Sequence, residues 1–575
     1  MAGCSTTDLV TDASRAAANG CNGVCELRAN PRARLLLVVA CAVSAVLLAH
    51  YPMVFSGLRL VQADPMDTRL NNYFLEHAHR HLTGTSGDGS IWSPAFFHPL
   101  ENATAYGDVL WSLWPAYGIW RFMGMAPDTA FQLWMMCATL LNCVIFYVFL
   151  GACFSLSGLP ACAGALLFAV GSSRICQMGH QQLISHFYVV LALIAVCKLL
   201  HAPPAPDCDD LPGRDRARTR TWMALFFGAC VAQCYAGFYN AFFLAVILIS
   251  AFALSLLLPD LRWRTTGFVK IHPGPVLAFA LPAALMLLPL YVHYDRAKDA
   301  VGTRAWHEVT PMLPRPQSWF CMPPGSLLYA RMGRLGLFRA LPMRNEHHLG
   351  TGFLTPIVAA LGLWKRRRRS GVRLVVIAAM TMVCGVTIWP GAHSAWWFIY
   401  RCMPGAQAVR AVARIGIFLL VPAGLGLALF LEGRSPRTRP WLLLIAMLCI
   451  LEQAQALATY SKAYSRACVA SIVGAIDRDC QAFFVSAEGG ASGNEPEIHT
   501  EVRTHVDAMW AQMQTGIPTV NGYSGHYPRD YGRLQRLVVR DAADVREIES
   551  ALQSWADRWR LDRDSICWVK LKATP

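Results

Sequence analysis

The stretch "LLLVVACAVSAVLLAHYPMVF", residues 35–55, contains no charged side chain. An apolar run of this length is enough for an α-helix to cross about 30 Å of hydrocarbon, so it predicts a membrane-spanning helix. Only 15% of the 575 residues are charged, whereas soluble domains carry about 25%. Similar apolar runs recur along the chain and predict a polytopic α-helical membrane protein. The predicted spans are 35–55, 107–124, 129–150, 160–176, 183–200, 222–237, 238–258, 274–293, 351–364, 372–389, 411–431 and 440–459.

The distribution of charge supports this class. The chain has 51 basic and 36 acidic residues, a net charge of +15. Its basic residues gather in short stretches between apolar runs, as in cytoplasmic loops under the positive-inside rule. Orientation in a membrane therefore accounts for the net charge, and we expect no nucleic-acid partner. The stretches are Arg28, Arg32 and Arg34, then RDRARTR (214–220), RWR (262–264), KRRRR (365–369) and RSPRTR (434–439).

These stretches predict a topology. Residues 1–34 form a cytoplasmic tail, 35–459 the transmembrane domain, and 56–106 and 294–350 two long outer loops. From residue 202 onward the crossings alternate without conflict, which leaves 460–575 outside. The first third of the chain gives no consistent topology, because four crossings after the first outer loop would place RDRARTR on the outer side of the membrane. Either one short run, of which 160–176 is the weakest, is re-entrant, or 129–158 contains a break. An odd number of crossings is required there, and the total is about 11–13 helices.

The outer C-terminal segment predicts a small α/β domain. QAFFVSA (481–487) and ICWVKL (566–571) read as strands, and 542–559 has the periodicity of a helix. Cys468 and Cys480 lie in this segment, where a disulfide between them is a candidate. We therefore expect residues 460–575 to form a periplasmic domain.

The stretch VQADPMDTRL (61–70) follows the first span. Asp64 is a favourable N-cap, Pro65 suits the first helical position, and Asp67 falls at the third, so a helix is predicted to about His81. Capping is one role for these acids. They also share a helix face with Asn71, and a carboxylate pair there suits deprotonation of a hydroxyl or binding of a divalent cation such as Mg or Mn.

Other polar residues interrupt apolar regions or border them. His180, Gln181 and Gln182 are candidates for lining a functional cavity or for capping a loop. Glu346 and His347 precede the span at 351, and Glu346 is a candidate second acid or cation ligand. Arg410 and Arg414 are four residues apart at a predicted outer helix end, where they suit a phosphate or ordinary snorkelling.

The order of several motifs resembles a large family of bacterial membrane glycosyltransferases with the GT-C fold, of the PMT/ArnT-like superfamily, which use polyprenyl-phosphate sugars. The likeness runs from about residue 60 to 531. Ala63 stands where glycine is common, and His98 where tyrosine is usual. The motifs are ADPMDTRLNNYFLEH, IWSPAFFHPLENATAYGDVL (91–110), GHQQL (179–183), CYAGFYNAFF (234–243), EHHLGTGFLTPIVAALGLW (346–364), MPGAQAVRAVARIGIFLL (403–420) and GIPTVNGYSGHYPRDY (516–531).

The resemblance implies an inverting glycosyltransferase of the bacterial inner membrane, with its site on the periplasmic face. Asp64 or Asp67 would be the general base, with Asp64 preferred, and these two would hold any metal. The donor would be a polyprenyl-phosphate-linked sugar, and the acceptor a glycolipid or other envelope glycan. Membrane lipids surround the protein. Substrate-binding candidates are Asn71, His98, Asp108, His180, Gln181, Glu346, His347, Arg410 and Arg414.

Two other functions are compatible with the sequence. One is a transporter or flippase for a glycolipid precursor, in which the buried polar residues would line a path. The other is a non-catalytic accessory protein that binds envelope glycan. The long outer loops and outer α/β segment favour the enzyme, since transporters more often have broken helices in paired halves.

Overall fold

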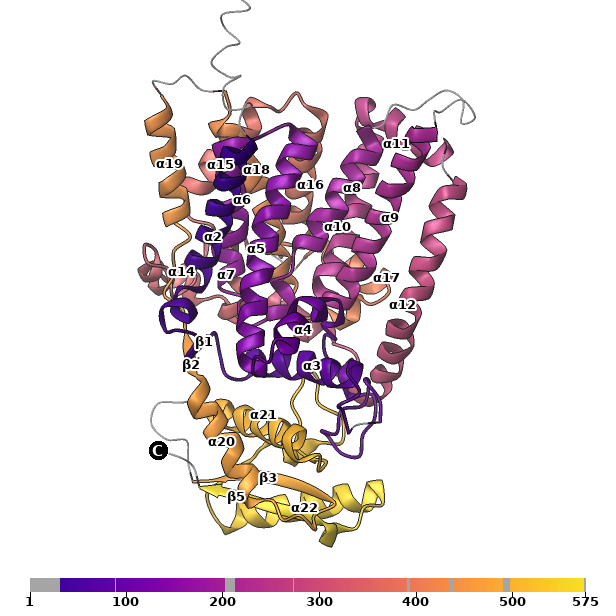
Figure 1. Cartoon of the computed structure of the whole chain (residues 1–575), viewed down its shortest axis with the longest axis vertical. Coiled ribbons are helices and arrows are strands. Elements are labelled where there is room, and N and C mark those ends of the chain that lie inside the picture. Colours follow the sequence, from indigo (N-terminus) through magenta and orange to yellow (C-terminus); the bar gives the residue numbers. More distant parts are fainter. Residues whose placement is uncertain are drawn as a thin grey trace, which may run out of the picture.

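The computed structural model describes residues 31–87, 89–201, 213–271, 273–389, 393–433, 438–489 and 497–572. They form a bundle of long helices with a small α/β unit at one end (Figure 1). Seven helical segments are long and apolar enough to cross a membrane, and three further apolar helices are shorter. With α9, which begins in a basic stretch, these make eleven described helices of the bundle. They are α2 (Pro31–Phe55), α5 (Pro127–Phe154), α6 (Gly158–Val170) continued by α7 (Ser172–Ile175), α8 (Phe187–His201), α9 (Gly213–Ala236), α10 (Phe238–Leu257), α12 (Pro273–Val301), α15 (Leu354–Lys365), α16 (Ser370–Val386), α18 (Leu420–Leu431) and α19 (Arg439–Leu451).

The first third of the chain differs from its prediction. Residues 107–124 do not form a span, because they hold only the turn η3 (Trp111–Leu113) and the nine-residue helix α4 (Trp114–Phe122). Nine residues rise about 14 Å, less than half of a bilayer core. α4 instead lies beside α3 (Asp67–Leu82) at the end of the bundle that faces the α/β unit (Figure 1). The short run that does not cross is therefore 107–124 and not 160–176, and α5 shows no break between Pro127 and Phe154.

The corrected count removes the topological conflict. α5 is continuous over 28 residues, and 158–175 is long enough to span. Three crossings, by α5, α6 and α8, therefore separate the first long loop from the basic stretch 214–220, which was expected to be a loop and forms the start of α9. This is the odd number that the charge pattern requires. The last predicted span, 440–459, is also shorter than expected, because α19 ends at Leu451 and the chain continues as loop.

Small residues set the packing in the middle of the bundle. A side chain on Gly362 of α15 would lie 1.9 Å from the carbonyl oxygen of Gly426, and one on Gly164 of α6 would lie 2.4 Å from that of Gly424. α18 is therefore in backbone contact with helices on two sides, an arrangement typical of membrane helices. This close packing fixes the position of the 3₁₀ segment η10 (Val412–Leu419), which leads into α18.

The C-terminal segment contains the predicted strands and helix. β3 (Ala482–Glu488) is the central strand of a parallel sheet, between β4 (Val538–Val539) and β5 (Ile566–Lys572). α20 (Lys462–Ala475), α21 (Glu497–Thr515) and α22 (Ala542–Trp559) accompany the sheet. A two-stranded ladder joins this segment to the first long loop, because β1 (Leu60–Gln62) pairs antiparallel with β2 (Thr459–Ser461).

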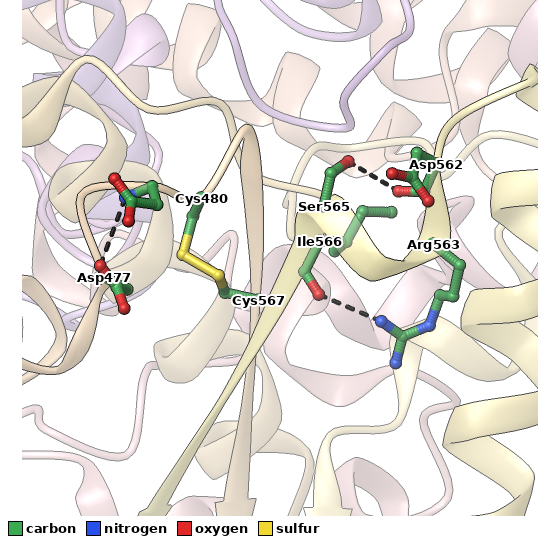
Figure 2. Close-up of a disulfide and its surroundings, with 8 residues drawn as sticks. Asp477, Cys480, Asp562, Arg563, Ser565, Ile566 and Cys567 are labelled. Carbon is green, nitrogen blue, oxygen red and sulfur yellow. Dashed lines mark hydrogen bonds between the residues drawn. A yellow bond between two sulfur atoms is a disulfide. The ribbon is translucent and has the colours of Figure 1, made fainter.

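A disulfide closes this unit. Figure 2 shows Cys480, just before β3, bonded to Cys567 in β5. The predicted partner, Cys468, is a free thiol on α20. Cys567 is brought next to Cys480 by the pairing of Phe483 with Cys567 in the parallel sheet, which sequence spacing alone does not reveal.

Candidate active site

The start of α3 is organised by Asp64. Its Oδ1 accepts hydrogen bonds of 2.8 Å from the backbone N–H groups of both Met66 and Asp67. Pro65 and Met66 form a turn, and the helix begins at Asp67, so the start lies two residues later than predicted. The N-cap of α3 is Met66, without a side-chain cap, so Asp64 stabilises the turn before the helix instead of acting as the predicted N-cap. This pair of hydrogen bonds fixes the Asp64 carboxylate relative to the helix axis.

The second oxygen of Asp64 faces Gly179, in the GHQQL motif. A Cβ atom on Gly179 would lie 2.5 Å from Oδ2 of Asp64, so only glycine leaves room for this carboxylate. Burial raises the pKa of Asp64, and the nearby charge of Asp67 raises it further. A carboxylate with a raised pKa binds a proton more strongly than an ordinary aspartate.

The pKa of Asp67 is shifted in the opposite direction from that of Asp64. Its Oδ2 lies 3.1 Å from Nδ1 of His180, and its Oδ1 accepts a 2.7 Å hydrogen bond from the Tyr523 hydroxyl. Burial tends to raise the pKa of Asp67, but the His180 and Tyr523 hydrogen bonds outweigh it and leave that pKa lowered. Two carboxyls three residues apart thus have pKa values shifted in opposite directions, an arrangement suited to acid–base chemistry.

The contacts continue from His180 to Arg414 and Glu346. Nη2 of Arg414 lies 2.8 Å from Nε2 of His180. Because guanidinium only donates, Nε2 accepts, and Nδ1 carries the proton that is shared with Asp67. Arg414 also pairs with both oxygens of Glu346, at 2.7 and 2.9 Å. Burial alone would raise the pKa of Glu346, yet Arg414 lowers it to about 2.

This chain of contacts joins distant parts of the sequence. It runs from Tyr523 through Asp67, His180 and Arg414 to Glu346, and we call it the site network. The guanidinium of Arg414 also lies over the ring of Tyr239, 5.3 Å from its centroid. Three of the predicted binding residues, His180, Glu346 and Arg414, are thus brought together with a predicted catalytic acid.

Two other predicted residues hold the GHQQL turn against α3. The Asn71 amide donates to Oε1 of Gln181 at 2.7 Å, and the Gln181 amide donates to the Thr68 hydroxyl at 2.8 Å. Gln181 is fully buried. The Asn71 amide also donates to Oε1 of Gln182 at 3.3 Å. These contacts hold the turn that carries His180 over Asp67.

Asp108 and Arg410 border the network. Oδ1 of Asp108 accepts a 2.6 Å hydrogen bond from the N–H of Phe238, the first residue of α10. Burial raises the pKa of Asp108, which the hydrogen bond from the Phe238 N–H and the charge of Arg414 partly offset. Within the part of the chain that the structure describes, no hydrogen bond or ion pair engages the Arg410 guanidinium, which contributes positive charge near Glu346.

The remaining two predicted residues make other contacts. Both ring nitrogens of His347 are used within the second long loop, at 2.8 Å from the Ser318 hydroxyl and 2.9 Å from the Pro311 carbonyl. The backbone of His98 binds the C-terminal unit, where its N–H donates to Thr519 and its carbonyl accepts from the Trp555 indole. These contacts give both residues a role in positioning segments.

Sequence reasoning missed the contribution of the C-terminal unit. Tyr523 lies in the quoted motif 516–531, but nothing in its spelling distinguishes it from the other tyrosines there. The unit also packs on α3 through a buried ion pair of Arg69 with Asp507, at 2.5 Å. The Tyr73 hydroxyl donates to Oε1 of Gln512 at 2.7 Å. Residues after position 500 thereby complete a site that begins at residue 64.

The described residues contain no group of three or more His, Cys, Asp or Glu side chains that could hold a metal ion. The Asp64–Asp67 pair, predicted as the ligands of any cation, has its oxygens directed at backbone N–H groups, Gly179, His180 and Tyr523. In this arrangement the polar partners of the carboxylates come from the protein.

No protein-family model matches the chain, and no curated protein matches it. Solved structures with a similar arrangement include the arabinofuranosyltransferase AftD from Mycobacteria, at 12% identity and a TM-score of 0.47, over 85% of this chain and 32% of AftD. The chain thus spans about a third of the length of AftD. Another is an Archaeoglobus fulgidus oligosaccharyltransferase tethered with an acceptor peptide, at 14% identity and a TM-score of 0.49, over 92% of this chain and 68% of that one.

A third is AglB, the archaeal oligosaccharyltransferase from Archaeoglobus fulgidus, in complex with an inhibitory peptide and a dolichol-phosphate. It is 12% identical, with a TM-score of 0.45, over 92% of this chain and 68% of AglB. The names of all three describe enzymes that transfer sugars. At these scores the likeness carries no argument about activity, donor or acceptor.

Proposed function

We propose that this chain transfers a sugar from a polyprenyl-phosphate donor to a hydroxyl group of a glycolipid or other envelope glycan. The observation that carries the proposal is the pair Asp64 and Asp67, fixed three residues apart with oppositely shifted pKa values beside the Arg414–Glu346 ion pair. A base and a cationic group for a departing phosphate are the two elements that such a transfer needs.

In this proposal Asp64 is the general base. Its raised pKa makes its carboxylate a better proton acceptor than an ordinary aspartate. The acceptor hydroxyl gives its proton to Asp64, and its oxygen attacks the anomeric carbon as the bond to the lipid phosphate breaks. Attack opposite the leaving group inverts the anomeric centre. Asp67 stays ionised because His180 and Tyr523 stabilise its charge.

The departing phosphate requires positive charge, which Arg410 supplies in this mechanism. Its guanidinium is not engaged by the described residues, whereas that of Arg414 is paired with Glu346. Arg414 therefore orients His180 and Glu346, and Arg410 binds a phosphate oxygen. Asp108, which is partly exposed, borders the substrate, and the buried Asn71 holds the GHQQL turn in place.

The charge pattern supports an orientation for this site. The starts of α2, α9 and α19 and the end of α15 lie at one end of the bundle, which we call the basic end (Figure 1). By the positive-inside rule, the basic end is cytoplasmic. The site network and residues 460–575 then lie on the periplasmic side of the bacterial inner membrane.

The test replaces each acid singly in the full-length protein and measures transfer from a radiolabelled polyprenyl-phosphate sugar. Asp64→Asn is expected to abolish labelling, and Asp67→Asn to reduce it at least tenfold. Asp295→Asn, which changes an exposed acid on α12, is the matched control and is expected to be neutral. Persistent labelling in Asp64→Asn would show that the general-base assignment is wrong.

The acceptor is identified by a second experiment. Mass spectrometry of envelope glycolipids from a deletion strain should reveal the loss of one sugar unit, which names donor and acceptor class together. An unchanged glycolipid profile would favour an accessory role, and accumulation of an unflipped precursor would favour a transporter.

A further inference from the structure

The second long loop contains a segment of unusual composition. Residues 320–344, which we call the basic apolar loop, contain four arginines and no acidic residue or lysine. Arg331, Arg334 and Arg339 are exposed. Large apolar side chains of the same loop are also exposed, each by more than half: Phe320, Leu327, Leu328, Leu335, Leu337 and Met343.

The loop is folded and has two faces. Cys321, Phe338 and Leu341 are at most 5% exposed and form a small cluster of their own. Leu335, Leu337 and Arg339 lie on either side of Phe338 in sequence and face outward. The outward apolar side chains are therefore a consequence of an ordered turn structure, in which η7 (Ala330–Arg334) is followed by α14 (Gly336–Arg339).

Hydrogen bonds fix the loop at the end of two membrane helices. The Leu327 N–H donates to the Ala454 carbonyl, and the Ala456 N–H donates to the Gly325 carbonyl, just beyond the end of α19. Glu452 links the same place to α15, because it accepts from the Tyr329 hydroxyl and from the N–H groups at the start of that helix. Figure 1 shows α14 on the flank of the bundle, beside the lower part of α19.

This position puts arginine and leucine side chains together at the level where membrane helices end. In water, six exposed large apolar residues in one loop are costly, but at a bilayer surface they enter the acyl boundary while the guanidinium groups reach phosphates. With the proposed orientation, four arginines also stand in an outer loop, where positive charge is usually scarce. A negatively charged lipid partner accounts for both features.

We propose that the basic apolar loop is a binding site for anionic phospholipid headgroups, inserted at the surface of the leaflet on the side of the site network. Leu335 and Leu337 enter the acyl boundary, and Arg331, Arg334 and Arg339 bind headgroup phosphates. The loop ends two residues before Glu346 of the site network, so its lipid contacts lie next to the candidate active site. The lipid site does not depend on the proposed transferase activity.

The first experiment localises the contact. The full-length protein is placed in nanodiscs of phosphatidylglycerol or of phosphatidylcholine with the same acyl chains, and hydrogen–deuterium exchange is followed by mass spectrometry. Peptides covering 327–341 are expected to exchange more slowly in phosphatidylglycerol. Equal exchange in the two lipids would overturn the proposal. Full protection of these peptides in phosphatidylcholine discs after addition of excess inorganic phosphate would also overturn it, because free phosphate would then replace the lipid headgroup.

The second experiment measures binding in variants. Because each arginine near an anionic surface strengthens binding about fivefold, the triple change R331Q/R334Q/R339Q is expected to weaken phosphatidylglycerol binding by on the order of a hundredfold by native mass spectrometry. Phosphatidylcholine binding should not change. The triple change R331K/R334K/R339K should retain most of the preference.

The matched control removes three exposed arginines from the C-terminal unit, as R478Q/R536Q/R546Q. Lipid also binds to the basic end, equally in all variants. The result is therefore the difference in phosphatidylglycerol affinity between R331Q/R334Q/R339Q and R478Q/R536Q/R546Q. Equal affinities in these two triples, with unchanged thermal unfolding, would contradict the lipid site.

Discussion

The hydroxyl of Tyr523 donates a 2.7 Å hydrogen bond to Oδ1 of Asp67, across 456 positions of sequence. Asp67 belongs to the first residues after the first membrane helix, and Tyr523 to the C-terminal unit. The pKa of Asp67, in the candidate active site, is therefore lowered by a residue near the other end of the chain. This relationship gives the C-terminal unit a direct effect on the proposed chemistry.

Tyr523→Phe tests that effect through pH. The hydrogen bond lowers the pKa of Asp67, so its removal raises that pKa. The proposed activity requires both carboxylates to be ionised, so Asp64, with its raised pKa, sets the upper part of the acidic limb of the pH profile and Asp67 the lower part. In Tyr523→Phe this lower part of the limb should move to higher pH. Tyr527→Phe, which removes a neighbouring hydroxyl, should leave the limb in place. A limb unmoved in Tyr523→Phe would contradict the coupling.

Gly179→Ala tests the space beside Asp64. The new Cβ would lie 2.5 Å from Oδ2, and the carboxylate is held from the other side by two N–H groups. We expect at least a tenfold loss of transfer with little change in thermal unfolding. Gly474→Ala on α20, where a Cβ meets nothing within 4 Å, is the control. Full activity in Gly179→Ala would show that Asp64 need not keep this position.

Glu346→Gln tests the buried ion pair. The side chains of Arg414 and Glu346 are only 8% and 13% exposed, so loss of the carboxylate charge should destabilise the protein by about 3 kcal/mol. Glu432→Gln breaks the more exposed pair with Arg366 and should cost less than about 1 kcal/mol. Thermal unfolding in detergent, followed by tryptophan fluorescence, measures both. Equal shifts in the two variants would argue against a buried pair.

Cys567→Ser tests the disulfide. The bond closes a sequence separation of 87 residues, and disulfides typically stabilise a folded unit by about 2–4 kcal/mol. We expect earlier unfolding of the C-terminal unit by limited proteolysis, and the same result from Cys480→Ser. Cys468→Ser should be neutral, since that thiol is free. An effect of Cys468→Ser equal to that of Cys567→Ser would contradict the Cys480–Cys567 bond and favour the predicted Cys468–Cys480 pair.

Several local features could be read from the sequence because they depend on near neighbours. Asp64 caps the turn before α3 since its side chain reaches N–H groups two and three residues ahead. The helix at 542–559 and the strands around 481–487 and 566–571 follow from periodicity and side-chain type. The membrane span predicted at 107–124 was wrong, because hydropathy measures only how apolar the side chains are and does not show where the chain turns along the membrane surface.

The sequence by itself determined a multi-pass helical membrane protein and named most members of the site network, since hydropathy, charge and capping act over short separations. It did not determine which of those residues meet. Tertiary structure decided that Asp67 contacts His180 and Tyr523. It also decided that Arg414 forms an ion pair with Glu346, and that Cys480 bonds to Cys567. These contacts depend on helix packing and sheet register across hundreds of residues, and such distances leave no local pattern in the chain.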